Sequence, residues 1–267
     1  MLYLIKFGGN AISDAKDLQR LCDEIGDMTA SGSKIILVHG GGPEISDEME
    51  KAGLRPKKID GVRITDPQGL EVVERVLSRI NSRVTEALDR SGVPNVGMPA
   101  SECTKCRRIG PADYLEDGIW KVADMGLVGE VEAVYESKLN SILDQGKVPV
   151  IYPIGSDGIN KLNVNADTMA AGIAAAMRCD EMIAITDVPG VLKDVGDPSS
   201  KYDRLTIDEV NALIEDGTIS GGMIPKVEAC IDAVRAGARA VRMVSGKGSD
   251  KIVSDAAEAN KGTVIKE

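Results

Sequence analysis

Two glycine-rich segments each follow a short apolar run and precede a stretch with helical periodicity. The first is Lys6-Phe7-Gly8-Gly9-Asn10, and the second is His39-Gly40-Gly41-Gly42-Pro43-Glu44. Glycines let the backbone approach a ligand closely, and consecutive N–H groups at a helix N-terminus bind phosphate or carboxylate oxygens. One such segment is equally consistent with an ordinary tight turn, but two of them at the ends of neighbouring strands favour an anion-binding site.

Neither segment matches a standard nucleotide-binding motif. No window of the sequence fits Gly, four residues and Gly-Lys-Ser/Thr, and the G-x-G-x-x-G turn is also missing. These omissions disfavour a P-loop ATPase and a dinucleotide-dependent dehydrogenase. A phosphate site in this chain therefore needs a different geometry.

Lys226 stands where a helix is expected to begin. Pro225 favours the first helical turn, and the helix dipole disfavours a cation there. Lys226 therefore makes most sense if it reaches into a site that holds negative charge. A solvated helix lysine is the alternative.

A second polar cluster precedes an alanine-rich helix. Asn163, Asn165 and Asp167 alternate along the chain, which places them on one side if the segment is extended. Asp167 is either only an N-cap or a carboxylate that holds Lys6 and Lys226 in position. The second arrangement suits phosphoryl transfer, because that reaction depends on positioning and charge stabilisation.

The strands and helices that position these residues can be predicted from the sequence, because short apolar runs alternate with amphipathic stretches. We expect strands at 2–7, 34–39, 95–98, 148–154, 181–186 and 240–244. We expect helices at 17–28, 44–52, 68–91, 136–145, 167–177, 206–216 and 225–236, several of them ended by Gly53, Gly92, Gly146 and Gly237. The alternation predicts an α/β fold with a mainly parallel sheet in a single domain.

Composition narrows the class of protein. The 267 residues carry a net charge of -10 and only 3% are aromatic, which disfavours nucleic-acid binding. No run approaches eighteen apolar residues, and Met1 leads into an apolar strand without a basic segment, so we expect a cytoplasmic protein with neither a membrane span nor a signal peptide. Five irregularly spaced cysteines argue against a disulfide framework.

The stretch from residue 101 to residue 129 differs from the rest of the chain. It mixes Gly, Pro, charges and short β-like pieces around Trp120, which predicts a hairpin excursion of the kind that often covers a ligand. Cys103 and Cys106 within it resemble half of a zinc or redox site. The chain has no second pair and only one histidine, so incidental thiols are favoured.

Six motifs in matching order resemble the amino-acid kinase family and, within it, the acetylglutamate kinases. They are KFGG (6–9), VHGGG (38–42), GVRIT (61–65), NVNAD (163–167), TDVPGV (186–191) and GGMIPK (221–226). The resemblance covers nearly the whole chain and implies a three-layer αβα sandwich. It also implies an N-terminal lobe of about residues 1–175, which binds an acyl-amino acid and dimerises, and a C-terminal lobe of about residues 176–267, which binds ATP.

The reaction that the resemblance implies is direct in-line transfer of the γ-phosphoryl group of ATP to the side-chain carboxylate of N-acetyl-L-glutamate, a step of arginine biosynthesis. Mg2+ is expected to bind the phosphate oxygens of ATP rather than a protein site. A carboxylate nucleophile needs no general base at neutral pH, since its pKa is about 4.3. His39 is therefore expected to be structural.

The resemblance also implies three groups of site residues. The catalytic group is Lys6, Gly8, Gly9, Asp167 and Lys226. The acid-binding group is Gly41, Gly42, Arg63, Asn163 and Asn165. The nucleotide-binding group is Lys6, Lys58, Thr186, Asp187, Gly190, Met223 and Lys226.

In these groups the two catalytic lysines stabilise charge on the transferred phosphoryl group and Asp167 orients both of them. The amides of Gly8, Gly9 and Gly41 contact phosphoryl oxygens. The fork of Arg63 suits an α-carboxylate, with a solvated arginine as the alternative. Lys58 is assigned near the ATP phosphates, although a surface charge is an equal interpretation.

The chain departs from the family pattern at residues 99–108, which replace a Ser/Gly/Asp-rich turn near the acyl group. N-acetylaminoadipate or a carrier-linked amino acid is therefore an alternative substrate. The net charge of -10 disfavours binding of an acidic carrier protein, although the basic residues of 105–108 offset this repulsion locally. A non-catalytic nucleotide or amino-acid sensor is a third possibility. Because arginine-inhibited members carry an additional N-terminal helix, we expect an arginine-insensitive dimer.

Overall fold

The computed structural model is built around an eight-stranded sheet. It describes residues 1–8, 14–116, 118–194, 196–246, 251–253 and 261–267. The strand order is β14-β16-β15-β13-β1-β2-β10-β5. In that order the strands span Arg204–Thr206, Thr263–Lys266, Val241–Ser245, Glu181–Thr186, Leu2–Phe7, Lys34–His39, Val148–Tyr152 and Asn95–Pro99. Every neighbouring pair is parallel except β15 with β16, so the mainly parallel sheet is confirmed.

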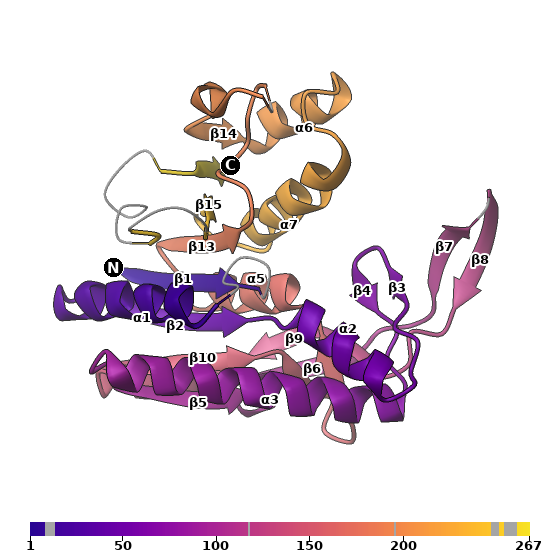
Figure 1. Ribbon diagram of the computed structural model, residues 1–267, viewed down its shortest axis with the longest axis horizontal. Coiled ribbons are helices and arrows are strands. Elements are labelled where there is room, and N and C mark those ends of the chain that lie inside the picture. The colour runs from indigo at the N-terminus through magenta and orange to yellow at the C-terminus, as the bar shows by residue number, and fades with distance from the viewer. Residues whose placement is uncertain (9–13, 117, 195, 247–250, 254–260) are drawn as a thin grey trace.

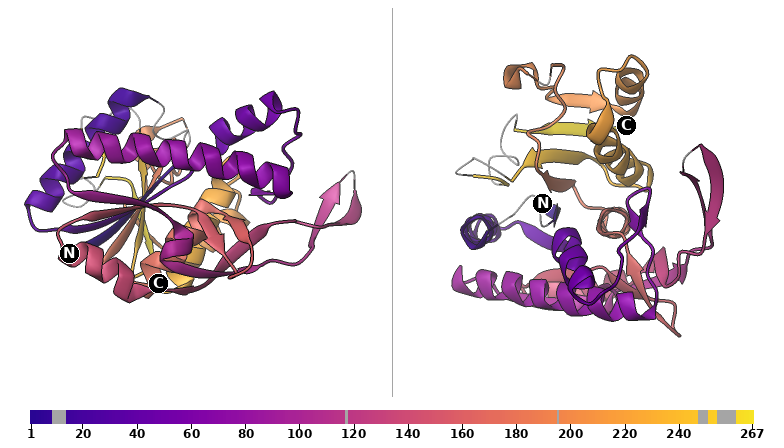
Figure 2. Two further views of the ribbon diagram at one scale, coloured as in Figure 1. Left: turned by 90° about the horizontal axis from the view of Figure 1, so that it is seen from below. Right: turned by 45° about the vertical axis from the view of Figure 1, so that its right-hand side comes forward.

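Helices cover both faces of this sheet, which gives the three-layer αβα sandwich (Figure 2). One face carries α1 (Ala15–Ala30), α2 (Gly42–Lys51) and α3 (Pro67–Arg90), and the other carries α4 (Glu136–Asp144), α5 (Ala166–Ala176), α6 (Ile207–Glu215) and α7 (Ile224–Arg235). Side chains alternate along a strand, so Leu4 of β1 joins one apolar cluster while Tyr3 and Ile5 join the other. Burial of both faces explains why the central strands are apolar without alternation.

The expected ends of four helices are confirmed at glycines. Gly53, Gly92, Gly146 and Gly237 follow α2, α3, α4 and α7 with φ of +75°, +69°, +70° and +113°. Glycine adopts these angles without the Cβ clash that other residues meet. The local sequence thus sets where these helices end.

A smaller sheet is formed by strands that come between β5 and α5 in the chain, and it was not predicted from the sequence. Its order is β11-β12-β9-β6, with strands Ile154–Ser156, Lys161–Val164, Val128–Val134 and Thr104–Arg108. The single strand expected at 148–154 is wrong, because Pro153 divides it into β10 and β11, which belong to different sheets. Proline has no N–H to continue a ladder, and the Pro153 carbonyl accepts a hydrogen bond from Val164 N at 3.0 Å.

Two hairpins project at one end of the molecule (Figure 1). They are β3 (Lys58–Ile59) with β4 (Val62–Arg63), and β7 (Ala112–Glu116) with β8 (Ile119–Ala123). The excursion expected over 101–129 is therefore confirmed in part: β7 and β8 project, whereas β6 and β9 belong to the smaller sheet. The two hairpins share a small apolar cluster around Ile59, Met125 and Val128.

Cys103 and Cys106 lie in the apolar interior. Both are fully buried, and a Cβ built on Gly155 would lie 2.3 Å from the Cys106 sulfur, so the thiol fills the space beside that strand. The described part of the chain contains no group of three or more His, Cys, Asp or Glu side chains able to hold a metal ion. Within the same residues, no helix is long and apolar enough to cross a bilayer.

Candidate active site

Three neighbouring strands of the central sheet end beside one cavity. Because β13, β1 and β2 are parallel, their carboxyl ends lie on the same edge of the sheet, which is where ligands bind in open α/β folds. A cavity of about 1260 Å³ opens at this edge. Of the site residues expected from the sequence, it brings together Lys6, Gly8, Gly41, Gly42, Lys58, Arg63, Asn163, Asn165, Asp167, Thr186, Asp187 and Lys226.

Lys6 points from β1 toward α5. It lies two residues after Leu4, so alternation places both side chains on the face that α5 covers. Its ammonium lies 2.6 Å from a carboxylate oxygen of Asp167, in the first turn of α5. The side chains of Lys6 and Asp167 are 14% and 39% exposed, so a ligand in the cavity can reach this pair.

Asn165, rather than Asp167, caps helix α5. Its side-chain oxygen accepts a hydrogen bond from Asp167 N at 2.7 Å. This leaves the Asp167 carboxylate to Lys6, so the alternative that Asp167 is only an N-cap is wrong. The sequence analysis considered only Asp167 for the cap, and the structure assigns that part to Asn165.

Lys226 lies in the first turn of α7, as Pro225 predicts. Its ammonium lies 2.5 Å from a carboxylate oxygen of Asp187, which directly follows β13. Asp167 was expected to orient both lysines, but here it pairs with Lys6 while Asp187 pairs with Lys226. The dipole of α7 disfavours a cation in its first turn, and the Asp187 carboxylate offsets this unfavourable interaction for Lys226.

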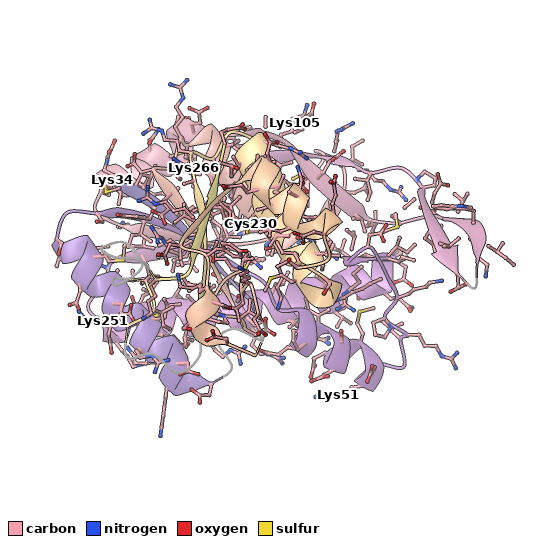
Figure 3. The ribbon with its side chains drawn as sticks, turned by 90° about the horizontal axis from the view of Figure 1, so that it is seen from above. Lys34, Lys51, Lys105, Cys230, Lys251 and Lys266 are labelled. Carbon is pink, nitrogen blue, oxygen red and sulfur yellow. The ribbon has the colours of Figure 1, made fainter. Side chains whose placement is uncertain are left out.

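Cys230 follows Lys226 by one turn of α7 and lies near the centre of the molecule (Figure 3). It lines the same cavity, and the charges of Asp167 and Lys6 act on it. Burial raises the pKa of its thiol to about 12. The thiol therefore stays protonated and is a poor nucleophile.

Arg63 is a buried cation beside the glycines that precede α2. Arg63 is only 6% exposed. Its guanidinium donates hydrogen bonds to Gly42 O at 3.2 Å and to Ser46 Oγ at 2.9 Å. Burial lowers its pKa, and no carboxylate of the described residues pairs with it. A buried cation without a counter-charge is unfavourable, so its place in the cavity wall indicates an anion-binding site.

Lys58 adds a second positive charge at this end of the cavity. It faces Arg63 across the β3–β4 hairpin, and burial together with the Arg63 charge lowers its pKa. The resemblance implies that Lys58 lies near the ATP phosphates, with a surface charge as the equal alternative. The structure places Lys58 beside Arg63, where an anion would relieve the repulsion between the two cations.

Thr65 connects Arg63 to Asn163. Its hydroxyl donates to Arg63 O at 2.8 Å and accepts from Asn163 Nδ2 at 2.9 Å. Thr65 is fully buried, so these bonds fix the Asn163 amide in the cavity wall. The sequence marked Thr65 only as part of a motif, and no local signal distinguishes it from a threonine packed in the core.

The expected glycines play different parts. Gly8 and Gly41 line the cavity; a Cβ on Gly8 would meet open space, whereas one on Gly41 would lie 2.6 Å from Ile80 Cδ1. Gly41 thus lets α3 pack closely against the loop, in addition to any contact with a ligand. Gly9 lies outside the described residues.

Two expected nucleotide contacts lie away from the cavity wall. Gly190 has φ of +141°, and a Cβ there would lie 2.6 Å from Thr263 Oγ1, so close packing explains this glycine. Met223 lies in the short helix Gly221–Met223 and packs against the apolar cluster that α7 joins.

The described residues of β7 and β8 also contribute nothing to the cavity wall, so the hairpin around Trp120 does not cover it.

Comparison with known proteins gives concordant matches. The model of the amino acid kinase family matches residues 1–245. The chain is 40% identical over 247 residues to an acetylglutamate kinase of Methanococcus maripaludis, covering 91% of this chain and 84% of that protein. It is 37% identical over 270 residues to an acetylglutamate kinase of Methanosphaera stadtmanae, covering 99% and 91%.

Solved structures share the fold at lower identity. The chain superposes on N-acetylglutamate synthase from Neisseria gonorrhoeae, complexed with coenzyme A and N-acetyl-glutamate, with a TM-score of 0.82 at 22% identity. The match covers 100% of this chain, which spans only 59% of the synthase chain. Carbamate kinase from Giardia lamblia matches with a TM-score of 0.68 at 18% identity, covering 99% of this chain and 98% of that one.

Proposed function

Because this chain belongs to the amino acid kinase family, we propose that it transfers the γ-phosphoryl group of ATP to the side-chain carboxylate of N-acetyl-L-glutamate. The products are ADP and N-acetyl-L-glutamyl 5-phosphate, an intermediate of arginine biosynthesis. The observation that carries this proposal is the 37% to 40% identity to acetylglutamate kinases over more than nine-tenths of the chain.

The chemical step requires no protein base. A carboxylate oxygen of the acid attacks the γ-phosphorus, the bond from that phosphorus to the oxygen bridging the β-phosphate breaks, and its electron pair leaves with ADP. The attacking carboxylate has an ordinary pKa of about 4.3 and is ionised at neutral pH. The burial of His39 and the protonated thiol of Cys230 agree with a mechanism in which neither group acts on the substrate.

Two of the cations that line the cavity act on the phosphoryl group of ATP, and the other cations bind the acid. Lys6 and Lys226 stabilise negative charge on the transferred phosphoryl group, and N–H groups of Gly8, Gly9 and Gly41 contact its oxygens. Asp167 holds Lys6 in place. This assignment is supported by the 2.6 Å pair of Lys6 with Asp167 in the wall of the same cavity that Lys226 lines.

The acid lies at the end of the cavity formed by Arg63. The guanidinium fork binds its α-carboxylate, Lys58 adds positive charge beside it, and Asn163 binds the α-substituent. Gly41 caps α2 and Gly42 begins it beside Arg63, and Asn165 shapes this wall as the cap of α5. The missing carboxylate partner of Arg63 among the described residues supports this placement.

ATP binds with Mg2+ on its phosphate oxygens, at the carboxyl end of β13 where Thr186 and Asp187 line the cavity. The lobe of about residues 176–267 supplies this nucleotide site. The lobe of about residues 1–175 binds the acid and forms the interface of a cytoplasmic homodimer.

A hydroxamate assay tests this function, because hydroxylamine traps an acyl phosphate. The purified protein is incubated with MgATP and, separately, N-acetylglutamate, N-acetylaminoadipate, glutamate and aspartate. We expect the largest signal with N-acetylglutamate. A larger signal with N-acetylaminoadipate would reassign the acid, and no signal with any acid alongside tight ATP binding would favour a non-catalytic sensor.

A further inference from the structure

His39 is the only histidine of the chain, and it is fully buried at the carboxyl end of β2. The rings of Phe7 and Tyr152 lie near it, with centroids 6.1 Å and 6.4 Å from that of the imidazole. Burial lowers its pKa to about 4, and the nearby charges of Glu44 and Arg83 are paired with each other. The imidazole is therefore neutral near pH 7, and His39 is not among the described residues that line the cavity.

Asn81 of α3 determines which imidazole nitrogen carries the proton. Its Nδ2 lies 3.0 Å from Val150 O and 3.1 Å from His39 Nε2. A carbonyl oxygen only accepts hydrogen bonds, so the amide nitrogen must face Val150, and its second hydrogen is then donated to Nε2. Nε2 is thus unprotonated, and the proton of the neutral ring lies on Nδ1. That nitrogen donates to Gly40 O at 3.1 Å.

This bond sets the direction of the peptide between Gly40 and Gly41. The peptide bonds of the described residues are trans, and in a trans peptide the C=O and N–H groups point in opposite directions. With Gly40 O turned toward His39, the Gly41 N–H points away from the imidazole. Both glycines line the cavity, and no acceptor for this N–H occurs among the described residues.

We propose that Asn81 and His39 form a positioning relay that aims the Gly41 N–H at the phosphoryl group during transfer. Neither side chain touches a substrate, and both act through the Gly40–Gly41 peptide. The relay rests on the proposed function, because an aimed N–H aids catalysis only when a phosphoryl group occupies the cavity. Gly97 makes room for it, since a Cβ there would lie 2.2 Å from Asn81 Oδ1.

The tautomer of His39 tests the relay without any assay of activity. In the full-length protein labelled with [15N]histidine, the single imidazole should be neutral, with its proton on Nδ1, from about pH 8 to about pH 5.5. In Asn81→Leu, which removes the donor to Nε2, the other tautomer should become populated. A wild-type proton on Nε2, or titration near the usual histidine pKa, would overturn the relay.

Kinetics test the consequence of the relay. Nδ1 of histidine and Nδ2 of asparagine lie the same number of bonds from Cα, so His39→Asn retains a donor to Gly40 O, whereas His39→Gln and His39→Leu do not. We expect kcat to fall about ten- to a hundredfold in His39→Gln and His39→Leu, with little change in either KM, and to recover largely in His39→Asn.

The matched control for lost stability is Val84→Ala, a packing residue buried one turn further along α3, which should keep the wild-type kcat. Equal kcat in the three His39 variants would overturn the relay. A wild type inactive on N-acetylglutamate would instead count against the proposed function, and the imidazole spectrum would then decide the relay.

Discussion

The ammonium of Lys226 lies 2.5 Å from the carboxylate of Asp187 and is paired with that residue rather than with Asp167. Asp167 lies 2.6 Å from Lys6 instead. The two lysines come from opposite ends of the chain but line one cavity, each held by its own carboxylate. The two ion pairs can therefore be tested separately.

Replacing either lysine should reduce the rate of the chemical step. We expect Lys6→Ala and Lys226→Ala to lower kcat by about a hundredfold or more with smaller changes in KM, because each ammonium stabilises charge mainly in the transition state. Steady-state measurement of ADP release checks this. Lys161→Ala, which breaks a surface pair with Glu74, is the control and should turn over normally. Near-normal turnover in a catalytic-lysine variant would remove that lysine from the mechanism.

Replacing Asp167 and replacing Asp187 should change different kinetic constants. Asp167→Asn leaves Lys6 without its counter-charge next to the reacting groups, so we expect kcat to fall about ten- to a hundredfold. Asp187→Asn releases Lys226 from its partner at the nucleotide end, so we expect the KM for ATP to change more than kcat. The reverse pattern would show that Asp187, and not Asp167, organises the transferred phosphoryl group.

Arg63 should determine affinity for the acid. Arg63→Lys retains the positive charge but loses the planar fork, so we expect the KM for the acid to rise about tenfold or more while the KM for ATP changes little. Rates measured over a range of acid concentrations at saturating MgATP give this value. An unchanged KM for the acid would reject the assignment of Arg63 to its α-carboxylate.

The parts of the structure that the sequence predicted depend on local patterns. The six long strands of the sheet are apolar runs next to glycine turns. Lys6 lies near the end of one of these strands, and Asp167 lies in the first turn of the alanine-rich helix α5. By contrast, β14 and β16 have three and four residues, which is too short for a periodic pattern to stand out. Pro153 was a visible signal for the break between β10 and β11, but the continuous apolar run around it favoured one strand.

The site contacts that sequence analysis missed join segments far apart in the chain. Asp187 and Lys226 are 39 residues apart, Thr65 and Asn163 are 98 apart, and His39 and Asn81 are 42 apart. A polar residue such as Asn81 on α3 has the same local pattern whether it faces solvent or a buried imidazole. Such partners become visible only when the fold brings the elements together.

Thr65 should affect acid binding through its two neighbours. Thr65→Val keeps the shape of the side chain but removes the hydroxyl that joins Arg63 O to Asn163 Nδ2. We expect the KM for the acid to rise about three- to tenfold, because a net hydrogen bond is worth about 1 kcal/mol. Thr65→Ser keeps the hydroxyl and should restore the wild-type KM. Equal KM values in Thr65→Val and the wild type would show that Asn163 is held without this bond.

His39 should make stability depend on pH below neutrality. Its pKa is 6.5 in an ordinary environment and about 4 in the folded protein. Between these pH values the unfolded chain binds a proton that the folded protein does not. The contribution of neutral His39 to the free energy of unfolding is therefore complete above about pH 6.5 and is lost as pH falls toward 4. From about pH 7 to about pH 4.5 the loss should reach about 2 to 3 kcal/mol, since one pKa unit corresponds to about 1.4 kcal/mol. Urea unfolding of the wild type and of His39→Asn at both pH values isolates this term, because all other titrating groups are shared. An identical pH dependence in the two proteins would contradict a neutral, buried imidazole.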